Sequence, residues 1–154
     1  MRIYSVNKGN EFTEYIPQRF MDEHREETIG TWLEQNPDCI VEDGGLLIIG
    51  RQVTTNLNSS IDLLGVDRAG NVAVVELKRD RTPRDTLAQA LEYASFTATV
   101  SSDQLEEIYR QYTADENASL VESHRGFFSL DESEAVSLRT HPKIAMSAKM
   151  LAEA

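Results

Sequence analysis

Three short apolar segments separated by polar turns occupy the middle of the chain. They cover Leu46–Val53, Ile61–Val66 and Val72–Lys78, and each has the length and the aliphatic content of a β-strand. The last two are joined by Asp67–Asn71, a loop short enough for an antiparallel hairpin. The sequence therefore predicts a three-stranded meander at the centre of the fold.

A helix is predicted before this meander, over Asp22–Gln35. Its apolar residues Ile29, Trp32 and Leu33 recur at helical spacing. Asn36-Pro37 ends it, because proline disfavours the helical conformation in the residue that precedes it. This helix is expected to pack its apolar face against the sheet.

A second helix is predicted after the meander, over Pro83–Thr97. Thr82 and Pro83 suit its start, and its apolar stripe is formed by Leu87, Ala90, Leu91 and Ala94. Further elements are a helix over Asp103–Tyr112, a helix near Ala118–His124 and a strand over Pro142–Met146. This order of helix, meander and helix predicts an α/β sandwich.

Bulk properties fit one domain without a membrane segment. The 154 residues contain no apolar run near the ~20 residues of a membrane helix and no signal peptide. Cys39 is the only cysteine, so an intramolecular disulfide is excluded and the cytoplasm is the simplest location. We expect an N-terminal arm over 1–21 and a domain over 22–154 with its core in 22–113, and the completeness of its C-terminal part stays open.

The net charge of −11 opposes an average attraction to nucleic acid. The cations are unevenly spread, however, and four of them fall in one stretch: Lys78, Arg79, Arg81 and Arg84. A local basic field near the end of the third predicted strand is therefore compatible with an acidic chain.

Two carboxylates are predicted to face each other across the hairpin. A loop centred on Ala69 pairs Val66 with Val72, and the same register places Asp62 opposite Glu76. Directly opposed like charges are destabilising, and the strand of Glu76 is otherwise apolar. A divalent cation such as Mg²⁺ or Mn²⁺ would resolve this repulsion, because both prefer oxygen ligands.

Lys78 is predicted on the same face of its strand as Glu76, because strand side chains alternate. Two metal-binding carboxylates and one ammonium suit phosphodiester hydrolysis, with the metal activating water and the lysine stabilising negative charge. The competing interpretation is that Asp62 and Glu76 are strand-end residues in solvent and that Lys78 pairs with one of them. A bulge in the hairpin would also break this register.

Two helices are expected to add side chains to this centre. Gln89 and Tyr93 lie four residues apart on the second helix and share a face that can border the carboxylates. On the first helix, Glu26 lies nearer the apolar face than Glu27 and could supply a third carboxylate. A solvated helix face is the alternative for both helices.

The combination of these segments resembles the PD-(D/E)XK nuclease superfamily. The resemblance is carried by Ser60-Ile61-Asp62, by Glu76-Leu77-Lys78 and by Gln89-x-x-x-Tyr93. The NucS (EndoMS) nuclease domain is the most similar branch, through the runs 32–37, 49–52, 61–67, 74–79 and 88–93. The likeness covers roughly residues 26 to 100.

This resemblance implies a restriction-endonuclease-like α/β fold, with a central mixed β-sheet flanked by helices. It implies metal ligation by Asp62, Glu76 and Glu26, with Glu27 as the near alternative to Glu26. Lys78 would be catalytic, and Gln89 and Tyr93 would assist. Isoleucine replaces proline before Asp62. Related enzymes carry a further DNA-binding and dimerising domain, whereas only Met1–Met21 precedes the similar region here, so mismatch or flap specificity is not carried over.

The resulting prediction is a Mg²⁺- or Mn²⁺-dependent endodeoxyribonuclease, acting in DNA repair or in defence against foreign DNA. The alternative is a non-catalytic nucleic-acid-binding or assembly module with the same fold. The residues do not separate DNA from RNA, or a monomer from a homodimer. The expected nucleic-acid contacts are Arg51, Arg79, Arg81 and Arg84.

Overall fold

The computed structural model describes the backbone of residues 3–6, 12–15, 26–40, 45–77 and 83–146, apart from 132, 135 and 137. The side chains described are those of 28–38, 40, 45–77 and 88–131, together with 133, 134, 136 and 138. The N-terminal segments Ile3–Val6 (β1) and Phe12–Tyr15 (β2) form a two-stranded antiparallel sheet.

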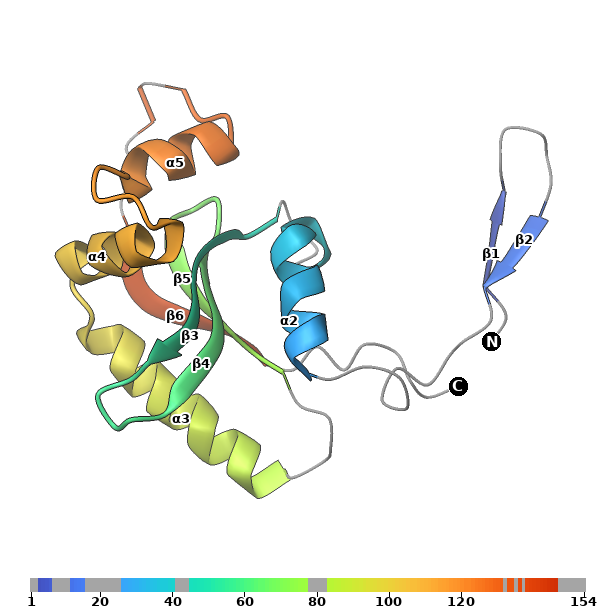
Figure 1. Cartoon of the computed structure of the whole chain (residues 1–154), viewed down its shortest axis with the longest axis horizontal. Helices are drawn as coiled ribbons and strands as arrows, with labels where there is room; N and C mark the ends of the chain where they lie inside the picture. The colour runs from blue at the N-terminus through green and yellow to red at the C-terminus, as the bar shows by residue number, and fades with distance from the viewer. Residues whose placement is uncertain are drawn as a thin grey trace.

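The main sheet has four strands in the order β3-β4-β5-β6. Leu47–Thr54 (β3), Ser60–Val66 (β4) and Asn71–Glu76 (β5) form the predicted antiparallel meander, and Arg139–Met146 (β6) joins β5 in parallel. The three central strands fall within one or two residues of their predicted bounds. A mixed sheet is therefore confirmed (Figure 1).

Helices cover both faces of this sheet. They are Glu26–Gln35 (α2), Pro83–Thr99 (α3), Ser102–Thr113 (α4) and Leu120–Phe127 (α5), with a 3-10 turn at Pro37–Cys39. In Figure 1, α2 lies on one side of the sheet, and α3 and α4 lie on the other. The Ser101 hydroxyl accepts a hydrogen bond from the backbone N–H of Gln104 and starts α4 with a capping box.

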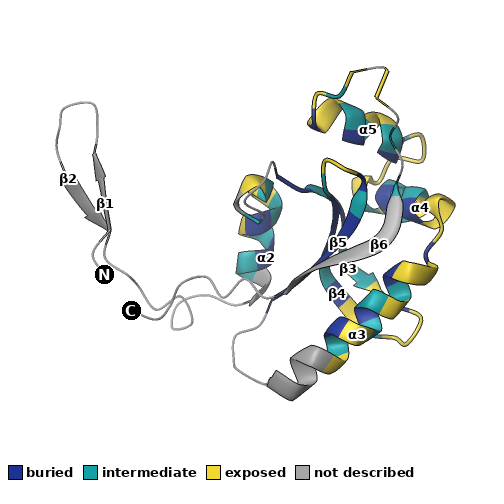
Figure 2. Ribbon diagram, turned by 180° about the vertical axis from the view of Figure 1, so that it is seen from behind, coloured by how far each residue is buried: buried dark blue, intermediate teal, exposed yellow. Residues whose placement is uncertain are grey.

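Two apolar cores fill the two interfaces, and Figure 2 shows the central strands buried between them. The α3/α4-side core joins sheet residues such as Leu64 and Val74 to Tyr93 and Leu105 of the helices. The α2-side core comprises Leu33, Leu46, Ile48, Leu63, Ala73, Val75 and Leu77, with Ile29 packed against it. The β4 and β5 side chains alternate between these cores, as a doubly covered sheet requires.

The prediction that Leu91 and Trp32 belong to the buried faces of their helices is wrong. Leu91 of α3 is 64% exposed, whereas Ala90, Tyr93 and Thr97 are buried among the described side chains of that helix. Trp32 of α2 is 42% exposed and does not join Ile29 and Leu33 in the core. In both helices the buried stripe is narrower than the apolar pattern, because the angle at which a helix crosses the sheet decides which flank of the stripe is covered.

The turn that joins β4 to β5 is closed by its own polar groups. The Asp67 carboxylate accepts hydrogen bonds from the backbone N–H groups of Ala69 and Asn71 at 2.9 Å each and from the Asn71 side-chain amide. His124 of α5 is buried, and its Nε2 lies 2.7 Å from the Asp67 carbonyl oxygen. Since a carbonyl only accepts, that nitrogen carries the proton. This end of the hairpin is tied to α5.

Candidate active site

The open end of the β4–β5 hairpin carries the two predicted carboxylates. The register pairs Leu63 with Val75 and Val66 with Val72, as predicted. Asp62 and Glu76 occupy the next position beyond the paired residues. The Asp62 carboxylate reaches β5 directly, because its Oδ2 accepts a hydrogen bond from the Leu77 backbone N–H at 2.7 Å.

The regular alternation of β4 is interrupted at Asp62. Ile61 belongs to the α3/α4-side core, whereas Leu63, two residues later, belongs to the α2-side core. Two residues apart on a regular strand share one face, so the packing of β4 changes sides at Asp62, although its pairing with β3 keeps one register from Leu64 to Ser60. The facing strand β3 has its own irregularity here, because Gln52 adopts a left-handed backbone with φ of 51°.

Asp62 is held by a chain of hydrogen bonds that reaches α3. Gln52 Nε2 donates to Asp62 Oδ1 at 3.0 Å, and the Ser60 hydroxyl donates to Gln52 Oε1 at 3.0 Å. The Tyr93 hydroxyl of α3 donates to the Ser60 carbonyl at 2.9 Å. Gln52 therefore combines a left-handed backbone with a side-chain amide that fixes Asp62, one of the predicted metal ligands.

Glu76 lies beside Tyr93 and is only 8% exposed. Burial raises the pKa of the Tyr93 hydroxyl above its ordinary value, and the negative charge and acceptor oxygens of the neighbouring Glu76 raise it further. Asp62 and then Glu92 add smaller contributions in the same direction. The Tyr93 hydroxyl therefore lies within the electrostatic reach of both predicted carboxylates and stays protonated at neutral pH.

Gln89 lies one turn before Tyr93 on α3, on the same side of the helix. Its Oε1 atom is buried and has no hydrogen-bond partner among the residues that the structure describes. A buried amide oxygen without a partner costs about 1–3 kcal/mol. A partner for this acceptor would therefore come from outside the described residues.

The remaining predicted site residues are described in part or not at all. Lys78, Arg79 and Arg81 lie outside the described residues. Glu26 begins α2, Glu27 follows it, and Arg84 lies in the first turn of α3, but their side chains are outside the described set. The structure thus brings Asp62 together with Glu76 and Tyr93, and it leaves the predicted lysine and the third carboxylate untested.

The described part of the chain contains no group of three or more His, Cys, Asp or Glu side chains that could hold a metal ion. Asp62 and Glu76 could supply two carboxylate ligands, which is a set that suits Mg²⁺ or Mn²⁺ and that waters or a substrate oxygen would complete. The donor chemistry fits a hard divalent ion. A third protein ligand would have to come from residues such as Glu26.

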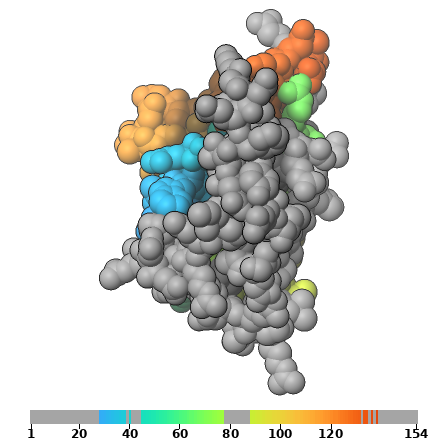
Figure 3. Space-filling model, turned by 90° about the vertical axis from the view of Figure 1, so that its right-hand side faces the viewer, coloured from blue at the N-terminus to red at the C-terminus, as the bar shows by residue number. Residues whose placement is uncertain are grey.

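Arg51, predicted to contact nucleic acid, lies on β3 and points toward α2. Its Nη1 donates to Glu34 Oε2 of α2 at 3.0 Å, and Tyr112 of α4 donates to Glu34 Oε1 at 2.6 Å. Burial and the bond to Glu34 raise the pKa of the Tyr112 hydroxyl. The Glu34 carboxylate therefore joins β3, α2 and α4 at the β3 edge of the sheet, and Figure 3 shows the surface of α2 in blue on this side of the molecule.

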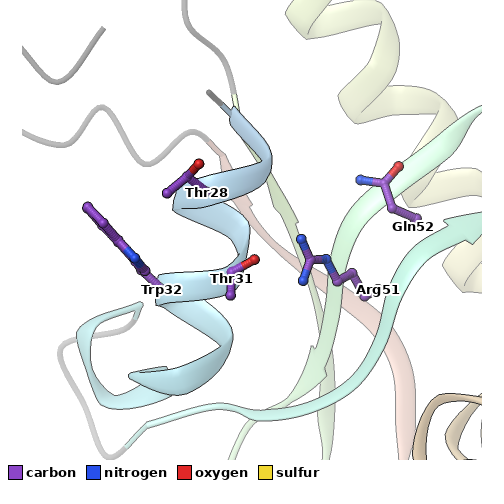
Figure 4. A pocket seen from close by; sticks show the side chains of 5 residues that line it. All are labelled: Thr28, Thr31, Trp32, Arg51 and Gln52. Atoms are coloured by element: carbon purple, nitrogen blue, oxygen red, sulfur yellow. The ribbon is translucent and has the colours of Figure 1, made fainter. Parts of the chain in front are cut away.

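A pocket of about 550 Å³ opens between α2 and β3, next to this arginine. Its described lining is Thr28, Thr31 and Trp32 from α2 with Arg51 and Gln52 from β3, as Figure 4 shows. Gln52 therefore belongs to both features, because it lines the pocket and donates to Asp62. Gln52 is therefore the contact between the pocket lining and Asp62.

Gln52 was not singled out from the sequence, although a signal was present. In the β3–β4 hairpin Thr54 pairs with Ser60 and Val53 with Ile61. The register argument that placed Glu76 opposite Asp62 would have placed Gln52 on its other side. The pocket itself carries no comparable sequence signal, since it depends on where α2 crosses the sheet.

Comparisons with protein-family models, with curated proteins and with solved structures found no match for this chain. No helix in the described part of the chain is both long enough and apolar enough to cross a membrane.

Proposed function

We propose that this chain is a divalent-metal-dependent nuclease that hydrolyses phosphodiester bonds in DNA. The observation that carries the proposal is the open end of the β4–β5 hairpin, where Asp62 and Glu76 share the surroundings of the Tyr93 hydroxyl. Two acids gathered at one end of an apolar hairpin weaken the fold unless a cation joins them. The resemblance to the PD-(D/E)XK superfamily and its restriction-endonuclease-like fold supports the same reading.

In this proposal each residue has a distinct task. Asp62 and Glu76 hold Mg²⁺ or Mn²⁺, which supplies an activated water and neutralises charge on the phosphate. Gln52 and the Leu77 N–H fix the orientation of Asp62, which leaves its carboxylate preorganised. Tyr93, which is neutral at pH 7 and whose pKa is raised further, acts as a hydrogen-bond donor and not as a base.

Three further residues complete the proposed centre. Gln89 offers its buried Oε1 as an acceptor for a water or for a substrate group. Lys78 stabilises negative charge that develops on the phosphate, and Glu26 adds a carboxylate from α2. Arg79, Arg81 and Arg84 are proposed to contact the phosphate backbone, which needs a local basic field on a chain of net charge −11.

The test compares cleavage of labelled single-stranded, flapped and mismatched DNA in Mn²⁺, in Mg²⁺ and in EDTA. The variants are Glu76→Gln and Asp62→Asn, with Glu122→Gln as a control because Glu122 is an exposed acid on α5. We expect loss of more than roughly 100-fold in both site variants, since even the outer partners of metal ligands contribute about 10–100-fold. The control should cut like the unaltered chain.

Cleavage that survives EDTA or the Glu76→Gln change would overturn the proposal. Absence of cleavage of every DNA, together with absence of Mn²⁺ binding by calorimetry, would favour the non-catalytic binding module. If RNA strands are tested in parallel and only RNA is cleaved, the proposed metal site stands and the substrate is RNA instead of DNA.

A further inference from the structure

We infer that the outer face of α3 is the contact surface of a homodimer, in which two copies of the chain pack this helix antiparallel across a two-fold axis. The outer face consists of Ala88, Leu91, Ser95 and Ala98, all of which are exposed. Figure 2 shows exposed residues of α3, in yellow, on the outside of the fold. The partner is a second copy of this chain, and the inference does not depend on the proposed reaction.

Leu91 draws attention to this face, because its spacing predicts a core residue and the fold leaves it in solvent. It is 64% exposed, whereas the neighbouring Ala90 is buried. Leu91 and Leu57 are the most exposed large hydrophobic residues in the described part of the chain. A single exposed leucine is ordinary on a protein surface, so the case for an interface depends on what surrounds it.

The surroundings of Leu91 carry almost no charge. Residues 88–99 contain one charged residue, Glu92, whereas Ser102–Thr113 (α4) contains four. The Glu92 carboxylate is used within the chain, because Thr55 Oγ1 donates to it at 2.9 Å. Charged residues are depleted at the centres of protein interfaces. On a chain of net charge −11, a face without charge lets two copies approach with little repulsion.

The spacing of the outer face fits a second copy of itself. Positions 88, 91, 95 and 98 are separated by three, four and three residues, so the order is the same in both directions. Two antiparallel copies related by an axis near position 93 therefore place Leu91 level with Ser95 of the partner subunit, and Ala88 level with Ala98 of the partner subunit. A two-fold interface requires such reciprocal pairs, and helices that pack along their length use this spacing.

The side-chain sizes are complementary in the same arrangement. Leu91 is the one large side chain of the outer face, and it lies opposite the small Ser95 of the partner subunit on both sides of the axis. The alanines at the two ends allow the helix axes to approach to about 8–10 Å. Tyr93 lies on the opposite face of α3 and is buried, so the pairing does not use the side chains of the proposed active site.

The size of the outer face predicts a weak dimer. It extends over about 15 Å of helix, at 1.5 Å for each residue. The loop 55–59 between β3 and β4 adjoins α3 through the bond from Thr55 to Glu92, and it adds the exposed Leu57. Interfaces of this limited extent are typical of transient complexes. We expect a dissociation constant on the order of 10–100 μM.

Sedimentation velocity of the full chain, from about 1 μM to about 1 mM, covers this range. Leu91→Lys should weaken the dimer by roughly 100-fold or more, because each dimer loses two buried leucines and gains two opposed cations. Phe127→Lys is the matched control, since Phe127 on α5 is an exposed apolar residue away from α3. It should dimerise like the unaltered chain, and both variants should fold because both positions are solvent-exposed.

Disulfide cross-linking tests the antiparallel register. The background is Cys39→Ser, because Cys39 is the only cysteine. A mixture of Ala88→Cys and Ala98→Cys chains should form a disulfide between one chain of each kind. Either chain alone should not, since its two thiols would lie about 15 Å apart along the helix pair, beyond the roughly 7 Å between Cα atoms that a disulfide spans.

A dimer that is lost in Leu91→Lys and cross-linked only in the mixture supports the inference. A chain that stays monomeric at every concentration overturns it, and the outer face would then be covered by a different protein. Equal dimerisation of Leu91→Lys and Phe127→Lys also overturns it, as does cross-linking of Ala88→Cys alone as fast as in the mixture. None of these measurements uses DNA or a metal ion, so their outcome is separate from that of the cleavage test.

Discussion

The two ends of the β4–β5 hairpin are built from similar residues and differ in what their acids do. At the turn end, the Asp67 carboxylate accepts hydrogen bonds from Ala69 and Asn71, all within its own loop. At the open end, Asp62 accepts from Leu77 and from Gln52, which belong to two other segments. Only the open end places a second carboxylate, Glu76, next to the first.

The comparison shows that Asp67 stabilises the fold, whereas Glu76 beside Asp62 costs stability. The Asp67 side chain supplies acceptors to turn N–H groups that would otherwise lack a partner within the chain. At the open end, Glu76 is 8% exposed and sits with Asp62 around one tyrosine, which concentrates negative charge in a poorly solvated place. Residues that cost stability in this way are typical of functional sites.

The largest effect should come from breaking the turn end. Asp67→Ala is expected to lower the free energy of unfolding by about 2–3 kcal/mol, because hydrogen bonds to a charged acceptor contribute about 1.5–3 kcal/mol. Urea unfolding measures this change. Asp115→Ala is the matched control, since Asp115 is exposed and accepts one hydrogen bond from the Asn117 N–H at 2.9 Å.

The control should lose less than about 1 kcal/mol. Equal losses in the two variants would mean that Asp67 is an ordinary surface turn residue. The contrast between the two ends of the hairpin would then disappear.

A smaller effect of opposite sign is expected at the open end. In EDTA, Glu76→Gln should raise the free energy of unfolding by about 1 kcal/mol, because it removes one of two opposed negative charges. Adding Mn²⁺ should stabilise the unaltered chain and leave Glu76→Gln unchanged, because only a chain that binds the ion gains stability from it. Thermal unfolding with and without the ion measures both.

Glu122→Gln should show neither effect, since it changes an exposed acid away from the site. Destabilisation by Glu76→Gln in EDTA would contradict the idea that this end is frustrated without a cation.

The sequence predicted the strand pairing at the open end, because the register of a hairpin follows from the position of its turn and side chains alternate along each strand. Val66 pairs with Val72 as expected, and that single register carries Asp62 toward Glu76. The meander and the C-terminal strand also follow the predicted pattern, because strand length and apolar content are local properties. The mixed sheet agrees with what the resemblance implied.

The sequence failed where the outcome depends on how whole elements dock. Leu91 and Trp32 look like core residues by spacing, but both are exposed, because the angle at which a helix crosses the sheet decides which flank of its stripe is covered. The position of Gln52 beside Asp62 follows from the β3–β4 register, but its backbone conformation does not. Its left-handed φ of 51° is rare for glutamine, and no local rule predicts a strained residue that a tertiary contact holds in place.

The smallest expected effect tests that strain. Gln52→Gly removes a left-handed non-glycine residue, which should return about 1 kcal/mol. It also removes the hydrogen bond to Asp62, which should cost about as much. The net change in the free energy of unfolding is therefore expected to be near zero. Ala114→Gly is the matched control, because Ala114 has φ of 54° at the end of α4.

Ala114 has no side chain that can hydrogen-bond, so its replacement should stabilise the chain by about 1 kcal/mol with cleavage unchanged. The difference between the two variants then measures how strongly Gln52 holds Asp62. Cleavage by Gln52→Gly should fall by roughly tenfold, because Asp62 keeps its charge and loses one of its two orienting donors. Equal stabilisation of both variants, with full activity, would show that the bond at 3.0 Å contributes nothing. The left-handed conformation of Gln52 would then follow from the course of β3 alone and would have no role in positioning Asp62.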